Sequence, residues 1–458
     1  MDDRRYRSRL LLVVMLSVMG FGSLMTIVTV SLSVIAEDLG TSRATLGWVV
    51  TGLMLAMAVA TPLAGKLGDL KGHRVVFLWG LLGGIVTTAL CGVAWDAASL
   101  ITFRVLFGLS GALVMPNAMS LMMHAFGPER RASAMGWFQF AMTGAPTIGL
   151  VIGGPMIDVV GWRAIFYAFA VVSLGAFVAG WALLRDSPRR AGATLDYLGA
   201  VTLGTSVLLL LLAATRAAET VRTEGVGGVV ADPATLALAA GALVAAIAFV
   251  RVERRATEPM LKLGYFRRRN FTAPLVSSAL TQFAYMGGFV VTPLLLDDVY
   301  GWAVGGISLL LALRPGAFSV ASPLGGRLAG QFGERLPLVG GAVLMVFSML
   351  AFAASSAGSA LVFVVAGLLL SGVASGIAGP ASSSMVAGAV DPEDMGVANG
   401  MSQQLMFVGI VSGIQIMLVA VGDDATTGRY ASTFVFGAVV AAGGLAAAML
   451  SRGRDRAS

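Results

Sequence analysis

Apolar stretches long enough to cross a lipid bilayer recur along this chain, and they constrain its fold more than any other feature. A helix needs about 20 apolar residues to span the hydrocarbon core. Because the bilayer offers no water to the backbone, such stretches must form helices that satisfy their own hydrogen bonds. The sequence therefore predicts an all-α polytopic membrane protein. We count fourteen spans, at about residues 10–36, 44–64, 75–95, 98–122, 132–157, 162–184, 197–215, 234–252, 271–296, 304–326, 336–355, 360–388, 396–420 and 431–450.

The composition supports this class of protein and excludes several others. Hydrophobic residues make up 57% of the chain and charged residues 12%, whereas soluble domains carry about 25% charged residues. The single cysteine, Cys91, excludes an internal disulfide, and the two histidines are far apart, so we expect no metal site. The sequence lacks the phosphate-loop pattern G-x-x-x-x-G-K-[ST]. We therefore expect no ATP-driven step and no cofactor.

The placement of positive charge predicts the orientation in the membrane. An even number of spans puts both termini on one side, and cytoplasmic loops carry the excess of Lys and Arg. With both termini in the cytoplasm, 24 of the 31 basic residues fall on the inner side and 5 on the outer side. The first apolar stretch continues to about Ala36, longer than the apolar region of a signal peptide, and no small-residue cleavage site closes it, so we expect it to be retained as a helix. The same distribution explains the net charge of +7 without nucleic acid.

A short polar segment occurs twice, and its repetition predicts two homologous halves. "TPLAGKLGDLKGHR" at 61–74 returns as "SPLGGRLAGQFGER" at 322–335. Both copies follow corresponding spans, the second and the tenth. A second echo pairs "GLSGALVMPNA" at 108–118 with "GVASGIAGPAS" at 372–382. Parallel repeats of this kind build many transporters, whose substrate site lies between the halves near the membrane midplane.

The sequence resembles the major facilitator superfamily, and more narrowly its fourteen-helix branch of drug:proton antiporters. "GKLGDLKGHR" (65–74) is similar to the family's cytoplasmic loop motif, "RVLFGLSGA" (104–112) to its fourth-helix motif, and "GLVIGGPMIDVVGWRAIFY" (149–167) to its antiporter motif. "LDYLGA" (195–200) and "RRATEPMLKLGYFRRRNF" (254–271) are similar to the segments that flank its extra helix pair. The resemblance implies two six-helix halves and two extra central helices. The corresponding domains are 1–190, 191–256 and 257–458.

Several residues receive roles from this resemblance. The cytoplasmic loop implies gating and conformational coupling through Gly65, Asp69, Gly72, Arg74 and, in the second copy, Arg335. The second copy carries Gly330 where the first has Asp69, which is consistent with a latch in one half only. The alternative is that Asp69 is a solvated loop carboxylate. The antiporter motif implies a helix that slides or bends, through Gly144, Pro146, Gly149, Gly153 and Gly154; ordinary close helix packing is the alternative.

Charged residues in or near the spans are candidates for proton or substrate coupling. Arg104 and Arg314 lie within the fourth and tenth spans, and Asp297 and Asp298 end the ninth. An ionisable residue inside the membrane is a functional candidate by default; the alternatives are structural arginines bonded to carbonyls and carboxylates solvated in an outer loop. The first helix carries Leu24 where the family usually has Asp, and we find no carboxylate in the middle of any span. Polar residues that are candidates for lining a cavity are Gln139, Gln282, Tyr285, Gln403 and Gln404.

These observations predict a bacterial inner-membrane transporter and not an enzyme. The expected function is export of amphipathic small molecules, drugs or natural products, driven by proton antiport with alternating access. The expected partners are such a substrate, protons and membrane lipid, in a monomer. One alternative is an uncoupled facilitator or importer with the same fold. An alternative of another class, a membrane-embedded regulatory or enzymatic protein, lacks any recognisable catalytic set or soluble domain in this sequence. The lack of carboxylates within the spans, beside Arg104 and Arg314, further predicts that neutral or anionic amphiphiles are exported in preference to quaternary or divalent organic cations.

Overall fold

The structure is a computed structural model, and it confirms the predicted all-helical fold. It describes residues 3–126, 142, 144–185, 197–224, 228, 231–255, 263–358, 361–390, 395–422 and 426–452. In these residues 11 helices are long and apolar enough to cross a membrane, and two further apolar helices, Thr45–Thr61 and Val201–Ala217, are shorter. One of the 11, Gly144–Leu183, covers parts of two predicted spans. These spans meet at Gly161, whose φ of 77° interrupts the helical backbone.

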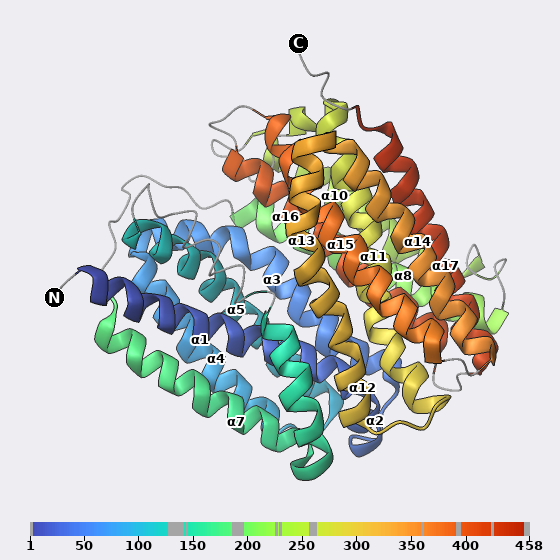
Figure 1. Cartoon of the computed structure of the whole chain (residues 1–458), viewed down its shortest axis with the longest axis horizontal. Helices are drawn as coiled ribbons and strands as arrows, with labels where there is room; N and C mark the ends of the chain where they lie inside the picture. The colour runs from blue at the N-terminus through green and yellow to red at the C-terminus, as the bar shows by residue number, and fades with distance from the viewer. Residues whose placement is uncertain are drawn as a thin grey trace. The chain divides into compact units, whose positions relative to one another are not determined.

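The chain divides into two compact units. Unit 1 comprises Met1–Ala200 and Ala303–Leu309. Within it, one helix, α7, packs against both α1 and α4, and another, α5, packs against both α3 and α4 (Figure 1). The elements of unit 1 are α1 (Asp3–Val30), α2 (Leu32–Asp38), α3 (Arg43–Lys71), α4 (His73–Gly92), α5 (Ala97–Ala125), a π-helical turn η1 (Gly149–Gly153), α7 (Gly154–Leu183) and most of α12 (Val304–Leu311).

Unit 2 comprises Val201–Trp302 and Leu310–Ser458. In this unit α15 packs against both α13 and α14, and α11 packs against α16 and α17. Its elements are most of α8 (Tyr197–Glu224), α10 (Pro233–Glu253), the 3-10 helix η2 (Leu263–Arg267), α11 (Arg269–Asp298), α13 (Leu313–Phe332), α14 (Arg335–Gly358), α15 (Leu361–Gly388), α16 (Met395–Val421) and α17 (Thr427–Leu450).

Two aspartates show how local sequence starts these helices. Asp96 precedes α5 and accepts a hydrogen bond from the Ser99 backbone N–H at 2.8 Å, in a capping box that lowers the pKa of Asp96. Asp232 caps α10 in the same way. Hydrogen bonds from the Thr235 hydroxyl at 2.7 Å and from Arg216 Nε of α8 at 3.0 Å lower the pKa of Asp232 to about 2. The second aspartate therefore also joins α8 to α10.

The repeated segment has the same backbone form in both copies. Gly72 ends α3 with φ 96° and donates to the Gly68 carbonyl at 2.8 Å. Gly333 ends α13 with φ 85° and donates to the Ala329 carbonyl at 3.1 Å. A positive φ favours glycine because it has no Cβ. The sequence repeat is therefore also a repeat of local structure.

Candidate functional site

The arginines that end the two repeated segments occupy matching positions. Arg74 Nη2 donates to the carbonyl of Trp181 at 2.8 Å, in the last turn of α7. Arg335 Nη2 donates to the carbonyl of Met449 at 3.0 Å, in the last turn of α17. A cation at a helix C-terminus satisfies carbonyls that have no partner within the helix and interacts favourably with the helix dipole. Each arginine thus ties its segment to another helix of its own unit.

The first copy of the segment also contains His73, which pairs with Asn117, a residue that the sequence analysis did not select. His73 Nδ1 lies 2.8 Å from Asn117 Oδ1, and Asn117 Nδ2 donates to the carbonyl of Ala64 at 3.1 Å. A Cβ added at Gly68 would collide with both His73 and Asn117. Asn117 therefore joins α3, α4 and α5. Its place in the second repeated echo, one residue after Pro116, was the available signal.

Two other residues of this loop, Gly65 and Asp69, and the second-copy counterpart of Asp69, Gly330, make fewer contacts that the structure describes. Gly65 lies beside α5, where an added Cβ would be in ordinary contact with Pro116 at 3.9 Å. The side chain of Asp69 lies outside the described residues, so its role as a latch stays a prediction. In the second copy, an added Cβ at Gly330 would meet nothing within 4 Å.

Arg104 is fully buried, with 0% of its surface exposed. Its Nε donates to the carbonyl of Val49 on α3 at 3.2 Å, whereas Nη1 and Nη2 make no hydrogen bond in the structure. The guanidinium carbon lies 5.4 Å from the ring centre of Phe107. At Gly108, an added Cβ would collide with the backbone of Leu53, so α5 lies tightly against α3 here. A buried cation with two free donor nitrogens can bind an anionic group or water in this span.

Arg314, in unit 2, is likewise a buried arginine with one nitrogen bonded to a backbone carbonyl. It is 1% exposed, and its Nη2 donates to the carbonyl of Tyr285 on α11. Nε and Nη1 make no hydrogen bond in the structure. The guanidinium carbon lies 3.4 Å from the ring centre of Tyr285 and 5.1 Å from that of Phe289. The structure thus brings together Tyr285 and Arg314, which the sequence analysis selected separately.

The two acidic residues at the end of α11 lie in its last turn and not deep in the span. Asp297 is half-buried and Asp298 is exposed. The carboxylate of Asp298 accepts a hydrogen bond from the hydroxyl of Tyr430 on α17 at 2.5 Å. Asp298 therefore joins two helix ends within unit 2.

The antiporter-like segment adopts an unusual backbone in the described residues. Gly149–Gly153 forms a π-helical turn, η1, between the residues around Pro146 and the start of α7. An added Cβ at Gly149 would lie 2.6 Å from the backbone oxygen of Ser23 on α1, and one at Gly153 would collide with Ile27. Gly144 has only an ordinary contact, with Met19 at 3.9 Å. Small residues therefore allow α1 to approach η1 closely, and a π-turn often marks a functional site.

At Gly154 the start of α7 also lies close to α12. A Cβ added at Gly154 would collide with Ser308. One turn further along α7, the carboxylate of Asp158 accepts a hydrogen bond from the backbone N–H of Gly305 at 2.7 Å. Both contacts lie within unit 1.

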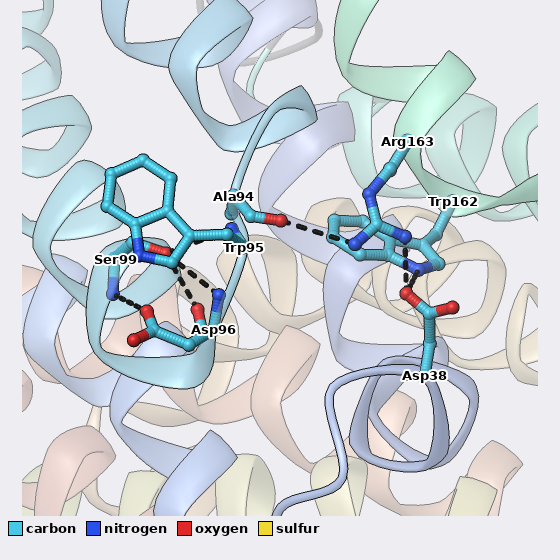
Figure 2. Close-up of polar contacts among 7 residues, drawn as sticks. All are labelled: Asp38, Ala94, Trp95, Asp96, Ser99, Trp162 and Arg163. Atoms are coloured by element: carbon cyan, nitrogen blue, oxygen red, sulfur yellow. Dashed lines mark hydrogen bonds and ion pairs between the residues drawn. The ribbon is translucent and has the colours of Figure 1, made fainter.

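A cluster in unit 1, also missed by the sequence analysis, joins the end of α2, the residues after α4 and the part of α7 after Gly161 (Figure 2). Asp38, at the end of α2, accepts hydrogen bonds from Trp162 Nε1 at 3.2 Å and from Arg163. Arg163 also donates to the carbonyl of Ala94 at 3.2 Å. The Trp-Arg pair of the antiporter-like segment was the available signal. These residues lie on the predicted outer side.

The other candidates are dispersed. Gln139 lies outside the described residues. Gln282 and Gln404 are half-buried, and Gln403 is exposed. Leu24, at the position where the family usually carries Asp, is buried at 2% exposure.

Long apolar helices with buried basic residues in two units define an integral membrane protein of the transporter class. Comparison with known proteins names the family. The sequence matches the Major Facilitator Superfamily over residues 10–414 and 275–458. The chain belongs to this family of membrane transporters, and it is not an enzyme.

Its relatives include drug exporters. The chain is 33% identical to the tetracenomycin C resistance and export protein of Streptomyces glaucescens, over 86% of this chain and 72% of that protein. It is 30% identical to the multidrug resistance protein Stp of Mycobacterium tuberculosis, over 85% of this chain and 71% of that protein. A solved structure of the nucleoside transporter NupG has the same fold, with a TM-score of 0.69 at 13% identity, over 97% of this chain and 99% of that one.

Proposed function

We propose that this protein exports amphipathic small molecules from the cytoplasm in exchange for protons, by alternating access. The observation that carries the proposal is the pair of buried arginines, Arg104 and Arg314, each with two nitrogens that have no hydrogen-bond partner in the part of the chain that the structure describes. A charge inside the membrane costs roughly 2.5–3.5 kcal/mol on insertion scales. Such a cost is consistent with a role in binding or coupling. Two of its relatives are named as a tetracenomycin C resistance and export protein and as a multidrug resistance protein, and these names support export of drugs or natural products.

The architecture that goes with this function is part of the proposal. It consists of two six-helix halves, 1–190 and 257–458, with an extra helix pair at 191–256, and both termini in the cytoplasm. The protein acts as a monomer within membrane lipid. Gating and coupling are assigned to the cytoplasmic loop residues and to the glycine-rich π-turn. The π-turn and its tight contact with α1 support a helix that changes shape during transport.

Two experiments test this function. First, a strain that lacks the protein should become hypersensitive to several unrelated amphipathic compounds, and expression of the protein should restore resistance. Second, reconstituted vesicles should show a change in lumenal pH when an exported compound is added. Resistance without a pH change would favour the uncoupled facilitator, and no change in susceptibility to any compound would contradict export.

A further inference from the structure

Arg314, in unit 2, has hydrogen-bond donors that the described residues leave without a partner. An arginine side chain has five N–H donors and no acceptor. Among the described residues only Nη2 has a hydrogen-bond partner, the carbonyl of Tyr285, while Nε and Nη1 have none, and Arg314 is 1% exposed. Buried polar groups are normally paired, and an unpaired one calls for an explanation. An oxygen-bearing anion at Nε or Nη1 would satisfy both the donors and the charge.

Two aromatic rings flank this guanidinium. Tyr285 and Phe289 are four residues apart on α11, so they lie on one face of that helix. Their ring centres are 3.4 Å and 5.1 Å from the guanidinium carbon of Arg314. Aromatic faces hold a cation by electrostatic attraction and also offer a flat apolar surface to a planar ligand. The site therefore combines a positive charge with a surface for stacking.

The backbone around Arg314 lacks one helical hydrogen bond and is closely packed. α12 ends at Leu311 and α13 begins at Leu313. Pro315 has no N–H to donate to the carbonyl of Leu311, which accounts for the break. On the other side, a Cβ added at Gly372 of α15 would collide with the backbone oxygen of Arg314. Ala312, between the two helices, keeps helical dihedral angles (φ −63°, ψ −18°), so the span stays continuous, and the contact with α15 fixes the position of the arginine.

The nearest acidic residues on α11 do not neutralise this charge. Asp297 and Asp298 lie in the last turn of α11, at least eight residues beyond Phe289, or about 12 Å along the helix axis. Asp298 instead accepts a hydrogen bond from Tyr430. The local charge at Arg314 is therefore positive, and it selects ligands with an acidic group.

We propose that Arg314 binds the negatively charged oxygen of a planar aromatic anion, such as a carboxylate or a deprotonated phenol, while Tyr285 and Phe289 stack on its ring. Anions of this class are then substrates. This inference deepens the proposed export function, and the substrate role rests on it. Arg104 has a comparable pair of nitrogens without a partner among the described residues, but it faces a single ring at 5.4 Å. Arg314 is therefore the better site for an aromatic ligand.

Binding to the purified full-length protein tests the site independently of transport. Equilibrium dialysis would compare naphthoate, its methyl ester and the naphthylmethyl-trimethylammonium cation, with decanoate as a carboxylate of the lipid type. The wild type should bind naphthoate at least tenfold more tightly than each of the other three. R314Q should lose at least tenfold in naphthoate affinity and keep the affinity for the ester. R251Q is the matched control, because Arg251 is exposed near the end of α10, and it should bind like the wild type.

A second variant keeps the inference testable if R314Q does not fold. Y285L combined with F289L keeps the charge and removes the rings, so naphthoate affinity should fall toward that of decanoate. Equal wild-type affinity for naphthoate and its ester would overturn the proposal, and so would unchanged naphthoate binding in a folded R314Q. Tighter binding of decanoate would identify a lipid site and also overturn it.

Transport assays separate this inference from the export function. Cells that express the protein should show lower accumulation of naphthoate, and R314Q should abolish this difference. If the protein protects cells against neutral compounds while wild-type naphthoate binding is no tighter than that of the ester, export stands and the anion site fails. If naphthoate binding depends on Arg314 but no compound is exported, the site stands and the export function fails.

Discussion

The carboxylate of Asp158 accepts a hydrogen bond from the backbone N–H of Gly305 at 2.7 Å, although the two residues are 147 positions apart. The bond joins the early part of α7 to the first turn of α12. A carboxylate is stabilised at a helix N-terminus by unpaired N–H groups and by the helix dipole. This contact therefore holds α7 and the start of α12 together within unit 1.

We expect Asp158→Ala to lower both thermal stability and transport at equal abundance. Loss of a side chain that caps a helix costs about 1 kcal/mol. Gly305→Ala should have a similar effect, because its Cβ would lie 2.5 Å from Asp158 Oδ2 and 3.2 Å from Pro155 Cα. Gly175→Ala in α7 is the control, since an added Cβ there meets nothing within 4 Å. If Asp158→Ala and Gly305→Ala both keep the melting temperature and the transport of the wild type, the hydrogen bond is dispensable.

The junction of α3, α4 and α5 gives a second prediction. Gly68→Ala should reduce the amount of folded protein strongly, because its Cβ collides with the hydrogen-bonded pair His73 and Asn117. Gly65→Ala, with only an ordinary contact at 3.9 Å, should fold normally. Gel-filtration profiles of the two variants, expressed in parallel, measure the difference. Similar profiles would mean that Asn117 moves aside without cost.

The helix-level organisation was predictable from the sequence for a physical reason. Spans are set by the thickness of the bilayer, so the apolar length predicts α4 or α17 without knowledge of packing. The predicted spans ended at about residues 64 and 326, whereas α3 continues to Lys71 and α13 to Phe332. The repeated glycines Gly72 and Gly333, which follow these ends with positive φ, were the available signal. The positions of Arg104 and Arg314 within spans followed from the apolar lengths.

The partners of these residues could not be predicted, because they depend on how each helix is rotated about its axis. In water, an apolar stripe identifies the buried face of a helix. In a membrane, lipid and protein interior are both apolar, so the pattern is lost. Gln403 and Gln404 looked equivalent in sequence, but the first is exposed and the second half-buried. Likewise, no pattern indicated that Arg74 would bind the carbonyl of Trp181.

The cluster of Asp38 with Arg163 supplies a third prediction. The side chain of Arg163 is 40% exposed and that of Asp38 is 44% exposed. Exposed ion pairs contribute about 0.2–1 kcal/mol to stability. A double-mutant cycle with Asp38→Ala and Arg163→Ala should therefore give a coupling free energy of about 0.5–1 kcal/mol, smaller at high salt. Thermal unfolding in detergent measures it. A coupling indistinguishable from zero at low salt would show that the pair contributes nothing to the stability of unit 1.

The cytoplasmic loop gives a fourth prediction, which concerns gating. Asp69→Asn should cut transport several-fold while leaving the amount of protein in the membrane unchanged, because a neutral amide interacts more weakly with a helix N-terminus or an arginine. Its counterpart, Gly330→Ala, should be fully active, since an added Cβ there meets nothing within 4 Å. Equal transport by Asp69→Asn and wild type at equal abundance would contradict the latch.

The last prediction separates two roles for Arg104. Lysine keeps the charge but loses the planar guanidinium and its five donors. In the structure, Nε is bound to the carbonyl of Val49 while the two terminal nitrogens are free. If the guanidinium positions a substrate or water between α3 and its own helix, Arg104→Lys should lose transport nearly as fully as Arg104→Ala, with both proteins present at wild-type abundance.

The alternative roles give different results in the same assay. A lysine variant with wild-type transport, beside an inactive alanine variant, would mean that a point charge is sufficient. An alanine variant with full transport would show that Arg104 serves neither coupling nor packing. Measuring the dependence of transport on external pH in all three proteins adds a readout that packing alone would not change. A coupling role predicts that Arg104→Lys alters this pH dependence, whereas a structural role predicts a lower rate with the same dependence.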